Sequence, residues 1–147
     1  MELGKSKNTP KGNPQAFRLS HKLRYSLFCG IGAMLTIGGL SVIGLATYTP
    51  LLMAPLGASA VLLFSAPESP LARIRNQLGG HSIAAIIGLI AIALPEQGPL
   101  VSAIAIALTV TLMSLFSCEH PPAGAVPLVM ILGDVEPSFL LGPVLCG

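Results

Sequence analysis

The chain has 147 residues, of which 52% are hydrophobic and only 10% are charged. Soluble domains carry about 25% charged residues, so this composition excludes a soluble globular protein and predicts one integral membrane domain. The net charge of +2 is unevenly distributed, because six of the eight Lys and Arg residues precede residue 25 and the others are Arg73 and Arg75. This layout favours the flank of a membrane segment over a nucleic-acid patch.

The first 23 residues are predicted to form a disordered, basic, cytoplasmic N-terminus, because residues 1–15 are polar and contain Pro and Gly. They do not resemble a signal peptide, since the apolar run that follows is longer than the usual ~7–15 residues. Residues 24–147 form the predicted transmembrane domain. Its first apolar segment, residues 25–47, is long enough to span a bilayer at about 20 residues per crossing.

Four more apolar segments follow at residues 51–64, 80–94, 100–117 and 123–132, and a further apolar run begins at residue 138. Segment 51–64 is short and contains Pro55 and Gly57. Because cationic loops stay in the cytoplasm, Arg73 and Arg75 should return to the side of the N-terminus. We therefore expect segment 51–64 to cross the membrane, and we expect the turn that contains Glu96 to lie outside.

A shift of 67 residues aligns the two short segments that proline interrupts. Residues 55–58, Pro-Leu-Gly-Ala, then lie over residues 122–125, Pro-Ala-Gly-Ala. Each unit would contain three crossings, so the second unit would be inverted. The predicted fold is an all-α polytopic transmembrane helix bundle, an inverted repeat with five segments present and a sixth after Gly147. Chance similarity between apolar stretches is the alternative.

The two interrupted segments predict an anion site. A proline at the start of a helix leaves the next N–H groups unpaired, and helix N-termini attract anions. We expect the two half-helix N-termini to face each other near the bilayer midplane and to bind a small anion without a buried cation, which would be costly to desolvate. Helix kinks with small packing residues are the alternative. The expected substrate-binding residues are Pro55, Leu56, Gly57, Ala58, Ser59, His120, Pro121, Pro122, Ala123, Gly124 and Ala125.

His120 is the titratable group of the second break. With an unperturbed pKa of about 6.5, a histidine can donate to an anion or carry a co-transported proton. His81 and Glu119 are candidates for a proton or gating role, and a capping or structural role is the alternative for the histidines. Glu119, His120 and His81 also offer metal ligands, but no pair has metal-ligand spacing on one helix, so we expect neither a metal nor a cofactor. No catalytic motif occurs, so we do not expect an enzyme.

Three motifs carry a family resemblance. They are Ala-Pro-Leu-Gly-Ala-Ser-Ala at residues 54–60, Arg-Asn-Gln-Leu-Gly-Gly-His at residues 75–81 and Glu-His-Pro-Pro-Ala-Gly-Ala at residues 119–125. In this order they resemble the HPP family of integral membrane proteins, which takes its name from the His-Pro-Pro motif. The resemblance covers residues 24–147.

The resemblance implies a polytopic protein like those of bacteria, cyanobacteria and plastids, some of which are implicated in nitrite transport. It therefore implies a bacterial or cyanobacterial plasma-membrane transporter or channel for nitrite, whose partners are the anion and the lipid bilayer and not nucleic acid. It also implies a further helix after the Gly-Pro-Val sequence at residues 142–144. The alternatives are a metal or cation transporter that uses Glu119, His120 and His81, and a non-transporting membrane scaffold. A core this small could be shared in a homo-oligomer.

Overall fold

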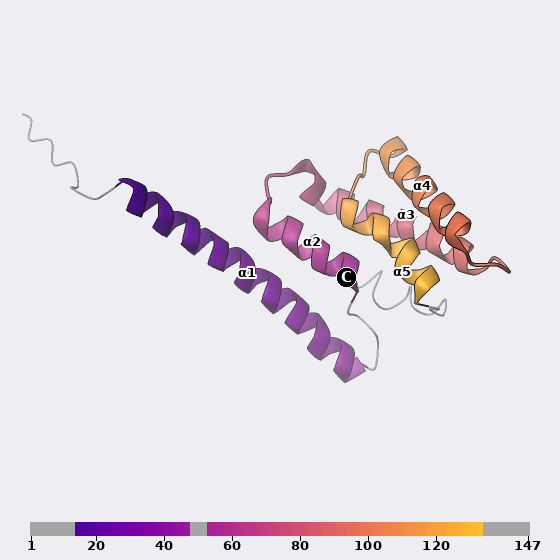
Figure 1. Cartoon of the computed structure of the whole chain (residues 1–147), viewed down its shortest axis with the longest axis horizontal. Helices are drawn as coiled ribbons and strands as arrows, with labels where there is room; N and C mark the ends of the chain where they lie inside the picture. The colour runs from indigo at the N-terminus through magenta and orange to yellow at the C-terminus, as the bar shows by residue number, and fades with distance from the viewer. Residues whose placement is uncertain (1–13, 48–52, 134–147) are drawn as a thin grey trace, which may run out of the picture.

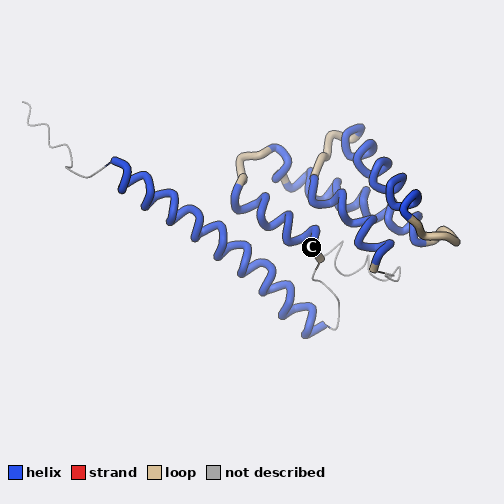
Figure 2. The backbone as a smooth tube through the Cα atoms, in the orientation of Figure 1, coloured by secondary structure: helices blue, strands red, loops and turns tan. Residues whose placement is uncertain are grey.

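The computed structural model describes residues 14–47 and 53–133, and all the regular secondary structure in these two ranges is helical (Figures 1 and 2). The helices are α1 (Pro14–Thr47), α2 (Ala54–Ser65), α3 (Ile74–Ile92), α4 (Pro99–Leu115) and α5 (Val126–Leu132). Two 3₁₀ turns, η1 (Pro70–Ala72) and η2 (Pro121–Ala125), precede α3 and α5. The predicted all-α class is confirmed over these ranges.

Prolines start most of these elements. Proline is favoured in the first turn of a helix because the N–H that it lacks would have no partner there, and its φ already suits a helix. Each of α2, α4, α5, η1 and η2 has a proline at its first or second position, namely Pro55, Pro99, Pro127, Pro70 and Pro121. The prolines that interrupt the apolar sequence are therefore the points at which new helices begin.

Successive helices run in alternating directions (Figure 1). The first part of α1 lies beside the end of α2, where Tyr25 Oη donates to the carbonyl of Ser65 at 3.1 Å. The first part of α3 lies beside the end of α4, because Arg75 Nη2 donates to the carbonyl of Phe116 at 3.0 Å. Arg75 therefore lies at the same end of the bundle as Tyr25, and the turn that contains Glu96 lies at the other end.

The core lies between α3, α4, α5 and η2, and α2 packs against η2. Small buried residues of α3, such as Ala84 and Ala85, share this core with Val126 and Met130 of α5. A side chain at Gly88 would overlap the Met130 side chain, so this glycine allows α5 to lie close to α3. Helix association inside a membrane relies on this kind of close packing at small residues.

Helix α1 lies to one side of this core, and its main contact is α2 (Figure 1). Its segment Arg18–Ala46 has 29 residues, none of its most apolar part is buried, and it is the one described helix long and apolar enough to cross a membrane. Helix α2 has 12 residues, which rise about 18 Å at 1.5 Å per residue, against a hydrocarbon core of about 30 Å. The crossing by segment 51–64 therefore stays a prediction.

The N-terminal region requires one correction. Residues 14–23 were expected to be disordered, but they form the first turns of α1. Extending an existing helix costs far less than nucleating one, and the helix-forming residues Ala16, Leu19, Lys22 and Leu23 lie directly before the apolar run. The expectations for residues 1–13, and for the sixth segment, lie outside the described residues.

Candidate functional site

The three motifs meet at one buried cluster, which contains Ser59 of α2, His81 of α3 and His120 just before η2. Ser59 Oγ lies 2.8 Å from Nε2 of His120 and 3.4 Å from Nε2 of His81. The centroids of the two imidazole rings are 5.2 Å apart. The three residues are 6%, 8% and 0% exposed, respectively. We call this group the Ser59 cluster.

The paired prolines hold His120 in place. A residue before proline is restricted to extended backbone, and His120, with φ −135° and ψ 94°, is the extended residue that caps η2. Its Nδ1 lies 3.0 Å from the carbonyl oxygen of Leu71 in η1. The turn η1 is itself capped by Ser69, whose Oγ accepts from the Leu71 N–H. The His-Pro-Pro sequence thus sets the direction of a histidine that contacts two other elements.

The loop that carries His120 packs against the motif at residues 75–81. A Cβ added to Gly80 would lie 2.8 Å from the His120 Cβ and 3.3 Å from the Cys118 carbonyl oxygen. At Gly79 it would lie 2.9 Å from the Cys118 Cβ. The buried Asn76 also donates from Nδ2 to the carbonyl of Glu119 at 2.9 Å. The glycine pair therefore makes room for the loop, and Asn76 attaches it to α3.

The hydrogen bonds of the Ser59 cluster have a single consistent direction. A carbonyl oxygen only accepts, so the proton of neutral His120 lies on Nδ1, which donates to Leu71. Its Nε2 then accepts from the Ser59 hydroxyl, and the Ser59 oxygen accepts from Nε2–H of His81. The chain therefore runs from His81 through Ser59 and His120 to the Leu71 carbonyl.

The open end of this chain is Nδ1 of His81. The atom is buried, and none of the described residues forms a hydrogen bond with it. An unsatisfied buried polar atom costs about 1–3 kcal/mol, a cost that a bound proton, water or ligand removes. In an apolar bundle such an atom indicates a functional site more than a structural one.

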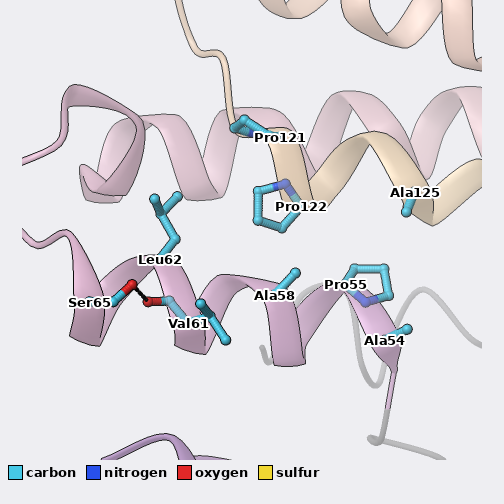
Figure 3. A pocket seen from close by; sticks show the side chains of 9 residues that line it. All are labelled: Ala54, Pro55, Ala58, Val61, Leu62, Ser65, Pro121, Pro122 and Ala125. Atoms are coloured by element: carbon cyan, nitrogen blue, oxygen red, sulfur yellow. Dashed lines mark hydrogen bonds between the residues drawn. The ribbon is translucent and has the colours of Figure 1, made fainter. Parts of the chain in front are cut away.

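The first turns of α2 and η2 lie together, as the aligned repeat predicted, but they lie side by side (Figure 3). They contact each other and line one cavity, in which Pro55 lies opposite Ala125, and Pro122 opposite Ala58. Helical N–H groups point toward the N-terminus of their own helix. Because the two elements are antiparallel, these groups point in opposite directions. Pro55, at the start of α2, lies opposite Ala125, at the end of η2, so the two N-termini point away from each other and do not face a common point.

Several of the expected free N–H groups already have backbone partners. The N–H groups of Leu56 and Gly57 both donate to the carbonyl of Met53, at 3.1 and 3.4 Å, and the N–H of Ala123 donates to that of His120 at 3.0 Å. The expectation of unpaired N–H groups is therefore wrong for these three residues. The physical reason is that α2 begins at Ala54, before its proline, and that η2 is a 3₁₀ turn that closes after three residues.

The cavity between α2 and η2 has a volume of about 570 Å³. Its lining is mainly apolar: Ala54, Pro55, Ala58, Val61, Leu62, Ser65, Pro121, Pro122 and Ala125 (Figure 3). The Ser65 hydroxyl already donates to the carbonyl of Val61. None of the three residues of the Ser59 cluster lines this cavity. The cavity therefore offers an anion few donors, and the polar chemistry lies on another face of α2.

The remaining candidates fall into two groups. Gly57 and Gly124 lie in open surroundings, because a Cβ at either position would have nothing within 4 Å of it outside its own helix. Glu119 has an exposed side chain and is attached through its carbonyl. Among the described residues, no three or more His, Cys, Asp or Glu side chains are grouped so that they could hold a metal ion.

The sequence interpretation missed three contributors to the site: Leu71, Asn76 and Gly80. Asn76 and Gly80 belong to the motif at residues 75–81, so the motif itself was the available signal. Leu71 contributes only its carbonyl, and no side-chain pattern could have identified that atom.

Comparison with known proteins agrees with this membrane interpretation. The family model of the HPP transmembrane region matches residues 18–147. Two proteins of Dictyostelium discoideum named as transmembrane proteins are similar to the chain. One is 36% identical over 105 residues, which cover 65% of the chain and 36% of the relative, and the other is 39% identical over 88 residues, which cover 57% and 28%. The chain thus spans about a third of the length of these relatives. No solved structure matches it significantly.

Proposed function

Because the chain belongs to the HPP transmembrane family, whose model matches residues 18–147, we propose that it is a membrane transporter or channel for a small monovalent anion, nitrite. One observation carries this proposal: the three family motifs converge on a buried Ser59 cluster with an unpaired nitrogen on His81. Ionisable residues at membrane depth are rare, and they mark solute and proton pathways.

The Ser59 cluster takes the place of the two facing helix N-termini as the centre of the proposed site. Ser59 and His120 belong to the expected binding set, and His81 joins them. Arg73 and Arg75 are exposed, so the site combines neutral groups and contains no fixed cation. A small, singly charged anion suits such a site, because a hydroxyl or imidazole N–H that turns from its present partner to the anion can replace part of its hydration shell, without a fixed cation that would bind it too tightly.

In the proposed topology the helices form a polytopic bundle that is built as an inverted repeat. Two features support it: successive helices alternate in direction, and the two proline-started short elements, α2 and η2 with α5, run antiparallel. The basic end of the bundle, with Arg73 and Arg75, faces the cytoplasm, and Glu96 faces the other side. The Dictyostelium relatives give no support to the expected bacterial membrane.

The test is uptake of nitrite by proteoliposomes that contain the purified protein. Ser59→Ala removes both hydrogen bonds to the histidines and should reduce the uptake rate at least tenfold. Thr109→Val is the matched control, since Thr109 is also buried and its hydroxyl bonds only within its own helix, to Ala105. This control should keep the uptake within about twofold of the parent protein.

The other outcomes separate the alternatives. Uptake that is unchanged by Ser59→Ala but is lost in Gly57→Leu and Gly124→Leu would favour the backbone anion site, since a Cβ at either position has nothing within 4 Å of it outside its own helix. No nitrite uptake above protein-free liposomes would refute the proposed function and favour a scaffold. Metal flux that disappears with His120→Ala would favour a cation transporter.

A further inference from the structure

We infer that Nδ1 of His81 is the proton-binding atom of the site, and that the anion binds together with this proton. The inference rests on the proposed function and names the second species that the site handles. It is carried by the direction of the hydrogen-bond chain and by the single buried nitrogen that the chain leaves open.

The open nitrogen is an acceptor. The Leu71 carbonyl determines which nitrogen of His120 carries the proton, and Ser59 passes that direction on to His81. His81 therefore donates through Nε2 and presents the lone pair of Nδ1. A lone pair repels an anion, but it binds a proton. After protonation the same atom is a charged N–H donor, buried and without a partner among the described residues, and it attracts the anion.

Among the described residues, no other buried charge is available to balance the protonated His81. Helices α2, α4 and α5 and the turn η2 contain no ionisable side chain. The ionisable groups of the neighbouring segments are Glu68, Arg73, Arg75, Cys118 and Glu119, besides His120 itself. The carboxyl and guanidinium groups among them are exposed, and Cys118 is buried against Gly79. A lone buried charge is costly, so a proton and a monovalent anion stabilise each other in this site.

The cluster holds a proton and does not conduct one. The chain of hydrogen bonds ends at the Leu71 carbonyl oxygen. This atom has no proton to release and accepts none under ordinary conditions. A proton that enters at Nδ1 of His81 must therefore leave from the same atom. The site would exchange its proton and its anion with one side of the membrane at a time, as in alternating access.

The first experiment reads the tautomers directly, by NMR of the native sequence labelled with ¹⁵N-histidine in detergent micelles. Neutral His81 should carry its proton on Nε2, and neutral His120 should carry it on Nδ1. On acidification His81 should gain its proton on Nδ1, and nitrite should raise the pH midpoint of this step. Ser59→Ala should remove the tautomer preference of His81, and His21, which lies outside the cluster, serves as the internal reference.

The opposite tautomer of His81 would overturn the inference, whatever the protein transports.

The second experiment measures nitrite uptake at membrane potentials set with potassium and valinomycin. Anion and proton that move together carry no net charge, so the uptake should not depend on the potential. Uptake that increases when the interior is made positive, with no effect of nitrite on His81, would overturn the coupling but leave the proposed function. Absence of uptake would refute the proposed function, and the tautomers would still decide where the proton binds.

Discussion

Substituting alanine for glycine at two helical positions should change stability in opposite directions. At Gly80, in the interior of α3, the new Cβ would lie 2.8 Å from the His120 Cβ and 3.3 Å from the Cys118 carbonyl. Neither atom is the far end of a flexible side chain, so the loop that carries His120 must move away from α3. At Gly57, in α2, the same methyl group would meet nothing within 4 Å outside its own helix.

The expected free-energy changes follow from three contributions. Alanine is favoured over glycine in a helix by about 1 kcal/mol, and this gain applies at both positions. At Gly80 the overpacking costs about 1–3 kcal/mol. Displacement of His120 from Ser59 leaves buried polar atoms unpaired, which costs about another 1–3 kcal/mol. Gly80→Ala should therefore destabilise the fold by about 3 kcal/mol, and Gly57→Ala should stabilise it by up to about 1 kcal/mol.

The measurement is reversible unfolding of the two variants and the parent in mixed micelles with an increasing fraction of SDS. The ¹⁵N signals of His120 should shift in Gly80→Ala and stay unchanged in Gly57→Ala. Equal stability of the two variants, with unchanged His120 signals in both, would refute the close approach of α3 and η2 on which the site depends.

Two further comparisons test the attachment of the loop and the topology. Asn76→Ala removes the part-buried hydrogen bond from the buried Asn76 to the Glu119 carbonyl and should cost about 1–3 kcal/mol in the same unfolding assay. Gln97→Ala removes an exposed hydrogen bond and should cost less than about 0.5 kcal/mol. A membrane-impermeant maleimide applied to intact cells should label Glu96→Cys but not Glu68→Cys, because the two turns lie at opposite ends of the bundle; labelling of both from outside would contradict this topology.

Much of the fold could be predicted because the chain contains few polar residues, and each one is informative. The prolines at residues 55 and 122 indicated where apolar runs break, and the structure starts new elements there. The alignment of residues 55–58 with residues 122–125 predicted an inverted repeat, which stays a prediction, but the two breaks do lie side by side.

The internal geometry of the site could not be predicted in the same way. A repeat shows which segments correspond, but it does not show how they cross, so the sideways packing of α2 and η2 required the structure. In the sequence, His81 lies at the start of the apolar run of residues 80–94, where an interfacial position was the natural expectation. It is buried because Gly80 allows the loop of His120 to cover it, and such a contact between distant segments leaves no periodic signal.

The hydrogen bond from His120 to Leu71 has a consequence for how this site can change during evolution. The acceptor belongs to the main chain, so no substitution at position 71 removes it, provided that the turn η1 keeps its shape. Mutation can therefore alter the size of the residue at position 71 without reversing the direction of the hydrogen-bond chain. A single codon change can break the hydrogen-bond chain only at the residues whose side chains form it: Ser59, His81 and His120. Selection on the polarity of the site would act on these three codons and on the shape of one turn.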